Sequence, residues 1–205
     1  MSDYATPFLP KIREKIEQWE GGYIHDPNDA GGETNFGIAL NRTDMTREEL
    51  LALNKDMAWE YLYTKYGQPL NIRDKTPGLA LLLLDGSINQ GLRGTTKRLQ
   101  RTINDYSVSF EEIEVDGYYG PKTEDALQEC VQFIHYDVDF LGLFAAKRMK
   151  HYAKITADNP TFIGGWSNRL MDVTAQAVAW DIVWAHDQKK IRMFEEYHAN
   201  KKQVA

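Results

Sequence analysis

Glu20 is the residue whose place in the sequence best suits acid–base chemistry. It ends the segment F-L-P-K-I-R-E-K-I-E-Q-W-E, in which Ile12, Ile16 and Glu20 recur at helical spacing, so Glu20 shares the apolar face of the predicted helix. Gly21-Gly22 follow at once and predict the end of that helix. Partial burial and the negative end of the helix dipole both raise the pKa of a carboxyl placed there. A carboxyl that stays protonated near neutral pH is suited to general acid catalysis, whereas a glutamate that merely extends to water is the structural alternative.

The turn after this helix supplies further polar groups. Asp29 follows Glu20 by nine positions and Thr34 follows it by fourteen. Glycoside hydrolysis uses an acid on the leaving oxygen and usually a second group that handles water on the opposite face of the sugar. Asp26 is a rival to Asp29 for that second role. Asp-Pro and Asn-Asp are also common turn dipeptides, so a purely structural role for one of the two aspartates is the alternative.

The segment E-G-G-Y-I-H-D-P-N-D-A-G-G-E-T-N-F-G-I resembles the signature of glycosyl hydrolase family 108, the N-acetylmuramidases found as phage endolysins and as bacterial cell-wall enzymes for secretion. It is also similar to the Glu…Asp…Thr order of phage-type lysozymes, with an Asp-to-Thr gap one residue shorter here. The resemblance implies a mainly α, lysozyme-like helical fold with a small β-hairpin or turn region near the active site, at Gly22–Ile38.

The same resemblance implies a reaction and the residues for it. The substrate is peptidoglycan, and the bond cleaved is the β-1,4 bond between N-acetylmuramic acid and N-acetylglucosamine. Glu20 is the catalytic acid, and Asp29 and Thr34 position or activate the attacking water. Two other functions remain alternatives: a lytic transglycosylase, which returns an anhydro sugar, and a non-catalytic protein that binds the cell wall. The substrate-binding candidates are Tyr23, His25, Asp26, Asn35 and Asn89.

Three later segments resemble other parts of this architecture. In D-G-S-I-N-Q-G, Asp85 and Asn89 stand one helical turn apart within an apolar helix, where buried polar groups either tie helices together or face the cleft floor. L-Q-R and V-D-G-Y-Y-G-P-K-T resemble the peptidoglycan-binding-type second half of the family, in which Tyr118 and Tyr119 are candidates for wall contact and a helix-start turn is the alternative. In F-I-G-G-W-S-N-R-L, Arg169 is expected to pair with an acid across the core.

Capping signals and apolar periodicity predict the helices that hold these residues. Thr46 and Glu49 form a capping box, which predicts one helix that continues to Gly67. The segment from Pro77 is apolar on nearly all sides and predicts a central buried helix, and Thr95 is expected to cap the next one. The last long helix is predicted to carry one apolar face made by Leu170, Val173, Ala177, Trp180 and Trp184.

By the family resemblance, the chain is expected to divide into a muramidase catalytic region at 7–93 and a helical peptidoglycan-binding-like region at 94–198. The two regions either pack as one globule or stay separate. The single cysteine, Cys130, excludes an internal disulfide, and in an apolar helix face its thiol is expected to be inert. The histidines show no metal-ligand spacing, so neither a metal nor a cofactor is expected.

Charge and hydropathy limit the partners. A net charge of −6 argues against a nucleic-acid binder. The family resemblance implies peptidoglycan as the partner, and the chain is expected to be a monomer. The N-terminus lacks the basic and apolar regions of a signal peptide. We therefore expect synthesis in the (host) cytoplasm, release through a holin-type membrane pore, and action in the periplasm or cell wall.

Overall fold

The computed structural model describes residues 6–25, 32–106, 111–132, 138–157 and 160–203. The chain is mainly α-helical with one small antiparallel sheet, which confirms the fold class expected from the sequence. The α-helices are α1 (Leu9–Trp19), α2 (Arg47–Ala52), α3 (Lys55–Leu62), α4 (Pro77–Gln90), α5 (Leu92–Tyr106), α6 (Pro121–Gln132), α7 (Val138–Ile155) and α8 (Ile163–Gln203). Shorter 3-10 segments lie at Thr6–Phe8, Leu40–Arg42, Gln68–Leu70, Ile72–Asp74 and Pro160–Phe162, and a π-helical turn at Tyr63–Gly67. The strands are β1 (Ile24–His25), β2 (Glu33–Asn35) and β3 (Ile38–Ala39).

Helix α4 is the centre of the fold, as its apolar sequence predicts. Each residue of Leu79–Leu84 is 2% exposed or less, because α1, α5, α7 and α8 pack around the helix. Thr76 caps its N-terminus through the Leu79 amide, and Pro77 occupies the first turn, where a missing N–H costs nothing. This helix therefore brings elements from both halves of the chain into one core.

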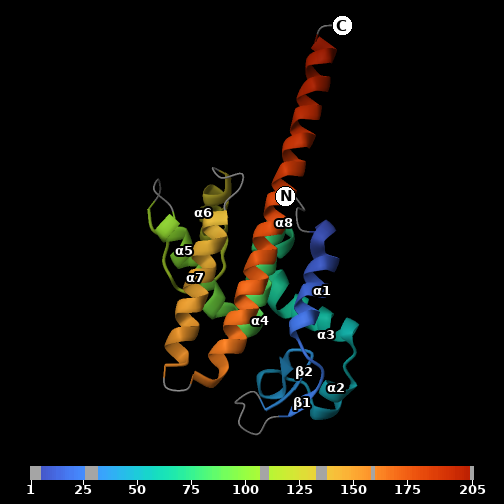
Figure 1. Cartoon of the computed structure of the whole chain (residues 1–205), viewed down its shortest axis with the longest axis vertical. Helices are drawn as coiled ribbons and strands as arrows, with labels where there is room; N and C mark the ends of the chain where they lie inside the picture. Colours follow the sequence, from blue (N-terminus) through green and yellow to red (C-terminus); the bar gives the residue numbers. More distant parts are fainter. Residues whose placement is uncertain (1–5, 26–31, 107–110, 133–137, 158–159, 204–205) are drawn as a thin grey trace.

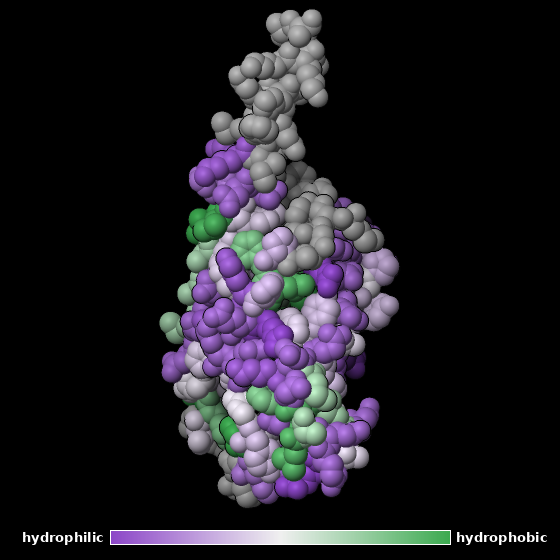
Figure 2. Space-filling model, turned by 90° about the vertical axis from the view of Figure 1, so that its right-hand side faces the viewer, coloured by the Kyte–Doolittle hydropathy of each residue, from purple (hydrophilic) through white to green (hydrophobic). Residues whose placement is uncertain are grey.

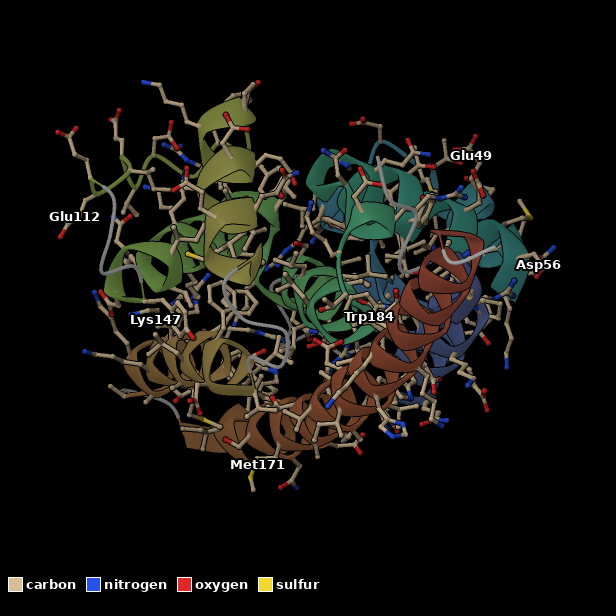
Figure 3. The ribbon with its side chains drawn as sticks, turned by 90° about the horizontal axis from the view of Figure 1, so that it is seen from above. Glu49, Asp56, Glu112, Lys147, Met171 and Trp184 are labelled. Carbon is tan, nitrogen blue, oxygen red and sulfur yellow. The ribbon has the colours of Figure 1, made fainter. Side chains whose placement is uncertain are left out.

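Helix α8 is the long element that passes between the two halves. In Figure 1 it runs between α5, α6 and α7 on one side and α1 and α3 on the other, and its last turns extend beyond the other helices. Leu170, Val173 and Ala177 are buried as predicted, whereas Met171 is 66% exposed and points outward in Figure 3. Gly78 allows the close contact with α4, because a Cβ there would lie 2.8 Å from the Ala177 carbonyl carbon.

The three strands form a sheet in the order β1-β2-β3, all antiparallel. Phe36 and Gly37 connect β2 to β3, with φ values of 47° and 78°. Two positive φ angles in succession are typical of a two-residue hairpin turn that matches the twist of the strands. This confirms the small hairpin expected within Gly22–Ile38.

Two predicted helix boundaries are wrong. The helix expected from Thr46 to Gly67 is divided into α2 and α3, because Leu53 is extended and the Asn54 side chain starts a new helix by accepting a hydrogen bond from the Met57 amide. Thr95 is not a cap, since α5 already begins at Leu92 and Thr95 lies buried inside it. The capping box itself, Thr46 with Glu49, is present.

The surface near α1 and α3 is mostly hydrophilic. Figure 2 shows this face, with smaller hydrophobic areas toward the end of the molecule where the strands lie. Within the described parts of the chain, no helix is both long enough and apolar enough to span a bilayer.

Candidate active site

Glu20 lies at the junction between α1 and the hairpin. The helix ends at Trp19, and Glu20 is its C-cap in an extended conformation, with its amide donating to the Ile16 carbonyl at 3.0 Å. Ile12 and Ile16 are buried, as predicted for the apolar face, and the Glu20 side chain is 13% exposed. The carboxyl is thus partly withdrawn from water without being sealed from it.

The hairpin turn packs directly on this carboxyl. A Cβ built on Gly37 would lie 2.5 Å from the Glu20 carboxyl carbon and 3.0 Å from its Cγ. A side chain at this position would force the Glu20 carboxyl to move, and a φ of 78° is free of strain only for glycine. Gly37 in the T-N-F-G-I segment is therefore favoured for two reasons: the backbone conformation of the turn and the close contact with Glu20.

Arg169 holds the other side of the Glu20 carboxyl. Its Nη2 donates to Glu20 Oε1 at 2.6 Å, and its Nε donates to Asp85 Oδ1 at 2.7 Å. This confirms that Arg169 pairs with an acid across the core, although it binds two. The apolar face of α1 predicts apolar surroundings for Glu20, but the structure adds a guanidinium to them.

Asp85 continues this chain of ion pairs into the interior. Arg148 Nη2 donates to Asp85 Oδ2 at 2.5 Å, and both side chains are fully buried. Burial opposes ionisation of Asp85, but the Arg169 and Arg148 guanidiniums outweigh it and lower the pKa of this carboxyl. Asp85 is an ionised anchor for two guanidiniums.

An apolar pocket lies beside Glu20, between α1, α3 and the hairpin turn. Trp59 stacks on Tyr63 with ring centroids 5.8 Å apart, and it presents an aromatic surface to this pocket. The pocket is small, with a volume of about 20 Å³, so it is a notch beside the carboxyl and not a site for a whole sugar ring. The lining residues are Ile16, Glu17, Glu20, Phe36, Lys55, Ala58, Trp59 and Leu62.

Three of the predicted site residues lie in or next to the strands: Thr34 in β2, His25 in β1, and Tyr23 immediately before β1. Thr34 is half-buried in β2, opposite Ile24. His25 is exposed in β1, and Tyr23 just before it is 43% exposed, with its hydroxyl donating to Glu33 Oε2 at 2.7 Å. Their predicted roles stay predictions.

Two other candidates make internal hydrogen bonds. The buried Asn35 amide donates to the Leu50 carbonyl at 2.9 Å. The Asn89 amide donates to the Asp85 carbonyl oxygen at 2.7 Å. Asp26 and Asp29 lie outside the described residues.

Glu33 is a charged group of the hairpin that sequence reasoning passed over. Arg47 donates to it at 2.7 Å, and this bond, followed by the Tyr23 hydroxyl, lowers the pKa of Glu33. The role of Arg169 toward Glu20 was also missed. Its signal was the F-I-G-G-W-S-N-R-L motif, but the identity of the acid depended on helix packing.

The second half of the chain makes its own contacts with the first. Buried Lys75 pairs with Glu124 at 2.7 Å, and Tyr119 donates to the same carboxyl at 2.7 Å. Burial and Glu124 raise the pKa of Tyr119. Tyr118, in contrast, is 70% exposed and is the more accessible of the two tyrosines considered for wall contact.

Comparisons with known proteins agree with this arrangement. Residues 13–91 match the family model described as Glycosyl hydrolase 108, and residues 95–171 match the model described as Predicted Peptidoglycan domain. The fold is similar to the structure of Brucella abortus SagA, with a TM-score of 0.71 and 25% sequence identity over 86% of this chain and 97% of the other. The comparison with curated proteins found no significant match. The chain is therefore a glycoside hydrolase that acts on peptidoglycan, similar over residues 13–91 to the glycosyl hydrolase 108 family.

Proposed function

We propose that the enzyme is an N-acetylmuramidase, which hydrolyses the β-1,4 bond between N-acetylmuramic acid and N-acetylglucosamine, and that Glu20 is its general acid. The observation that carries this proposal is the position of the Glu20 carboxyl. It is 13% exposed, fixed between the Gly37 turn and Arg169, and open to an apolar pocket with an aromatic wall.

The chemistry follows from that position. Glu20 donates its proton to the glycosidic oxygen as the bond to the sugar breaks, so the leaving group departs as an alcohol. Water supplies the hydroxyl that ends on the sugar ring. By the family resemblance, Asp29 and Thr34 hold or activate that water.

Glu20→Gln tests the general acid directly. The variant keeps a hydrogen-bonding side chain of the same size, so it should fold and should release reducing ends from purified peptidoglycan at least about a hundredfold more slowly. Glu14→Gln is the matched control, because Glu14 lies exposed on the same helix and should leave the rate unchanged. Near-normal activity of Glu20→Gln would overturn the proposal.

The products test the reaction class. Mass spectrometry of the released muropeptides should show reducing ends that have gained water. Anhydro ends would identify a lytic transglycosylase instead, and binding to sacculi without any release of sugar ends would identify a wall-binding protein.

We also propose a phage-type endolysin that acts as a monomer after release from the cytoplasm through a holin-type pore. The feature that supports this is the resemblance of residues 20–38 to a family that includes phage endolysins. Expression in bacteria should give lysis only when a pore-forming protein is co-expressed. Lysis without the pore would argue for another export route, and a dimer in gel filtration would contradict the monomer.

A further inference from the structure

We propose that Arg169 and Asp85 together position Glu20 and act on its carboxyl through their charges, so that the segment matching the peptidoglycan domain completes the active site of the hydrolase. The inference rests on the proposed role of Glu20 as general acid. It assigns to residues 95–171 a task within catalysis, in addition to any binding of the wall.

Each of the two matched segments supplies two of the four charged groups. Glu20 and Asp85 come from residues 13–91, whereas Arg169 and Arg148 come from residues 95–171. Arg169 reaches one carboxyl with Nη2 and the other with Nε, at 2.6 and 2.7 Å. A planar guanidinium presents these donors in fixed directions, which a lysine ammonium does not.

The burial of the four groups explains why they act on Glu20. Arg148 and Asp85 are fully buried, Arg169 is 9% exposed, and Glu20 is 13% exposed at the end of the series beside the pocket. Asp85, which binds Arg169, and Arg148, which binds Asp85, therefore lie inside the protein. Glu20 is the member of the series that lies beside the pocket. Arg169 is a positioning residue, since it acts through Glu20.

The charges oppose one another in a definite order. Loss of Arg169 would remove the cation that contacts the Glu20 carboxyl, and loss of the negative Asp85 would leave that cation to Glu20 alone. Arg148 binds the other oxygen of Asp85, so Asp85 holds one guanidinium with each of its oxygens. Removing Arg169 should therefore keep the proton on Glu20 to higher pH, and removing Asp85 should release it at lower pH.

The other charged groups near Glu20 have partners of their own. On α1, Glu17 pairs with Arg13 at 2.6 Å. On α3, Lys55 lies 3.8 Å from Glu17. On α8, Asp172 pairs with Lys15 at 2.7 Å and accepts the Trp19 indole N–H at 2.7 Å. On the hairpin, Glu33 pairs with Arg47 at 2.7 Å. Among the described residues, Arg169 is the cation bonded to Glu20, which makes it the group to change.

The test is the pH dependence of kcat/KM on a soluble glycan-strand oligomer, measured with the full-length protein. Activity needs protonated Glu20, so it falls on the alkaline side as that proton is lost. In Arg169→Gln the maximum should fall at least about tenfold and the alkaline limb should move up by about one pH unit or more. In Arg169→Lys the limb should stay near its wild-type position, because the charge remains, while the maximum still falls.

Asp85→Asn removes a negative charge and should therefore shift the pH profile in the opposite direction. In this variant the alkaline limb should move down by about one pH unit, because the charge of Arg169 is no longer shared. Circular dichroism identifies variants that fold. If Asp85→Asn does not fold, carboxyl carbon NMR titration of Glu20 in the wild type, Arg169→Gln and Arg169→Lys decides alone, and it should show the same upward shift for Gln and not for Lys.

A merely structural role would lower activity without moving the limb. The inference is overturned if folded Arg169→Gln keeps the wild-type alkaline limb, or if Arg169→Gln and Asp85→Asn move it in the same direction. These results differ from the result that would overturn the proposed function, which is near-normal hydrolysis by the Glu20→Gln variant.

Discussion

Gly37 and Glu20 are in van der Waals contact across the gap between the hairpin turn and the end of α1. The turn contributes backbone without a side chain at this point, so the Glu20 carboxyl fits between Gly37 and the Arg169 guanidinium. The carboxyl is thereby fixed on two sides by elements that are far apart in the sequence. Its orientation depends on the hairpin as much as on its own helix.

Gly37→Ala should lower activity more than it lowers stability. The added methyl would lie 2.5 Å from the Glu20 carboxyl carbon and would also strain a residue with φ of 78°, at a cost of about 1–2 kcal/mol. Displacing a catalytic group by about 1 Å costs on the order of a hundredfold in rate. Release of dye from labelled peptidoglycan measures the rate, and thermal unfolding measures the stability.

The control for this prediction is Gly142→Ala in α7. A Cβ there meets nothing within 4 Å, so the change should raise stability by about 0.5–1 kcal/mol and leave the rate unchanged. Equal rates for the two alanine variants would contradict the role of the Gly37 contact.

The buried ion pair of Arg148 should matter far more to stability than an exposed one. Arg148→Met leaves Asp85 with a single guanidinium at a fully buried position, and we expect the free energy of unfolding to fall by roughly 3–5 kcal/mol. Asp56→Asn removes the Arg13 partner at the surface, where the Asp56 side chain is 84% exposed, and should change it by less than about 1 kcal/mol. Urea unfolding of both variants gives the comparison, and similar losses would refute it.

Asp181 should make the protein less stable as the pH rises from acid toward neutral. Burial raises the pKa of this carboxyl from 3.8 to about 6, against the opposing hydrogen bonds from Thr76 and Gly78. The folded state therefore binds a proton that the unfolded state has lost between these two values, so stability falls with pH in that window.

Asp181→Asn removes this titration. The difference in unfolding free energy between wild type and Asp181→Asn should change by up to about 3 kcal/mol between pH 4 and pH 7, with the wild type losing more. Urea unfolding at several pH values measures it. A difference that is independent of pH would show that Asp181 does not titrate in this range.

Cys130 should resist thiol reagents in the folded protein. It is 5% exposed, and burial, with a smaller effect of Glu129, raises the pKa of its thiol to about 11. Ellman's reagent at about pH 8 should therefore react slowly with the native enzyme and fast after unfolding in guanidinium, because the thiolate is the reactive form. Fast labelling of the native protein would contradict this.

The sequence by itself determined the local features. The apolar run from Pro77 predicted the central helix, the spacing of Ile12, Ile16 and Glu20 predicted the buried face of α1, and Gly21-Gly22 predicted the end of that helix. These features depend on residues close in the chain, through helical period, capping and allowed backbone angles, so their signals are contained in short segments. The division of α2 from α3 was missed, because an internal Asn54 cap competes weakly with a continuous apolar pattern.

Only the tertiary structure decided what holds Glu20. Arg169 lies 149 positions away in the sequence and reaches the carboxyl because α8 packs on α4, next to the end of α1. The sequence predicted that Arg169 pairs with an acid, but several carboxyls were available and the choice depended on helix packing. The helix dipole and the burial of Glu20 could be anticipated from α1 alone. The Arg169 guanidinium that binds Glu20 comes from α8, and no local sequence pattern places that helix beside it.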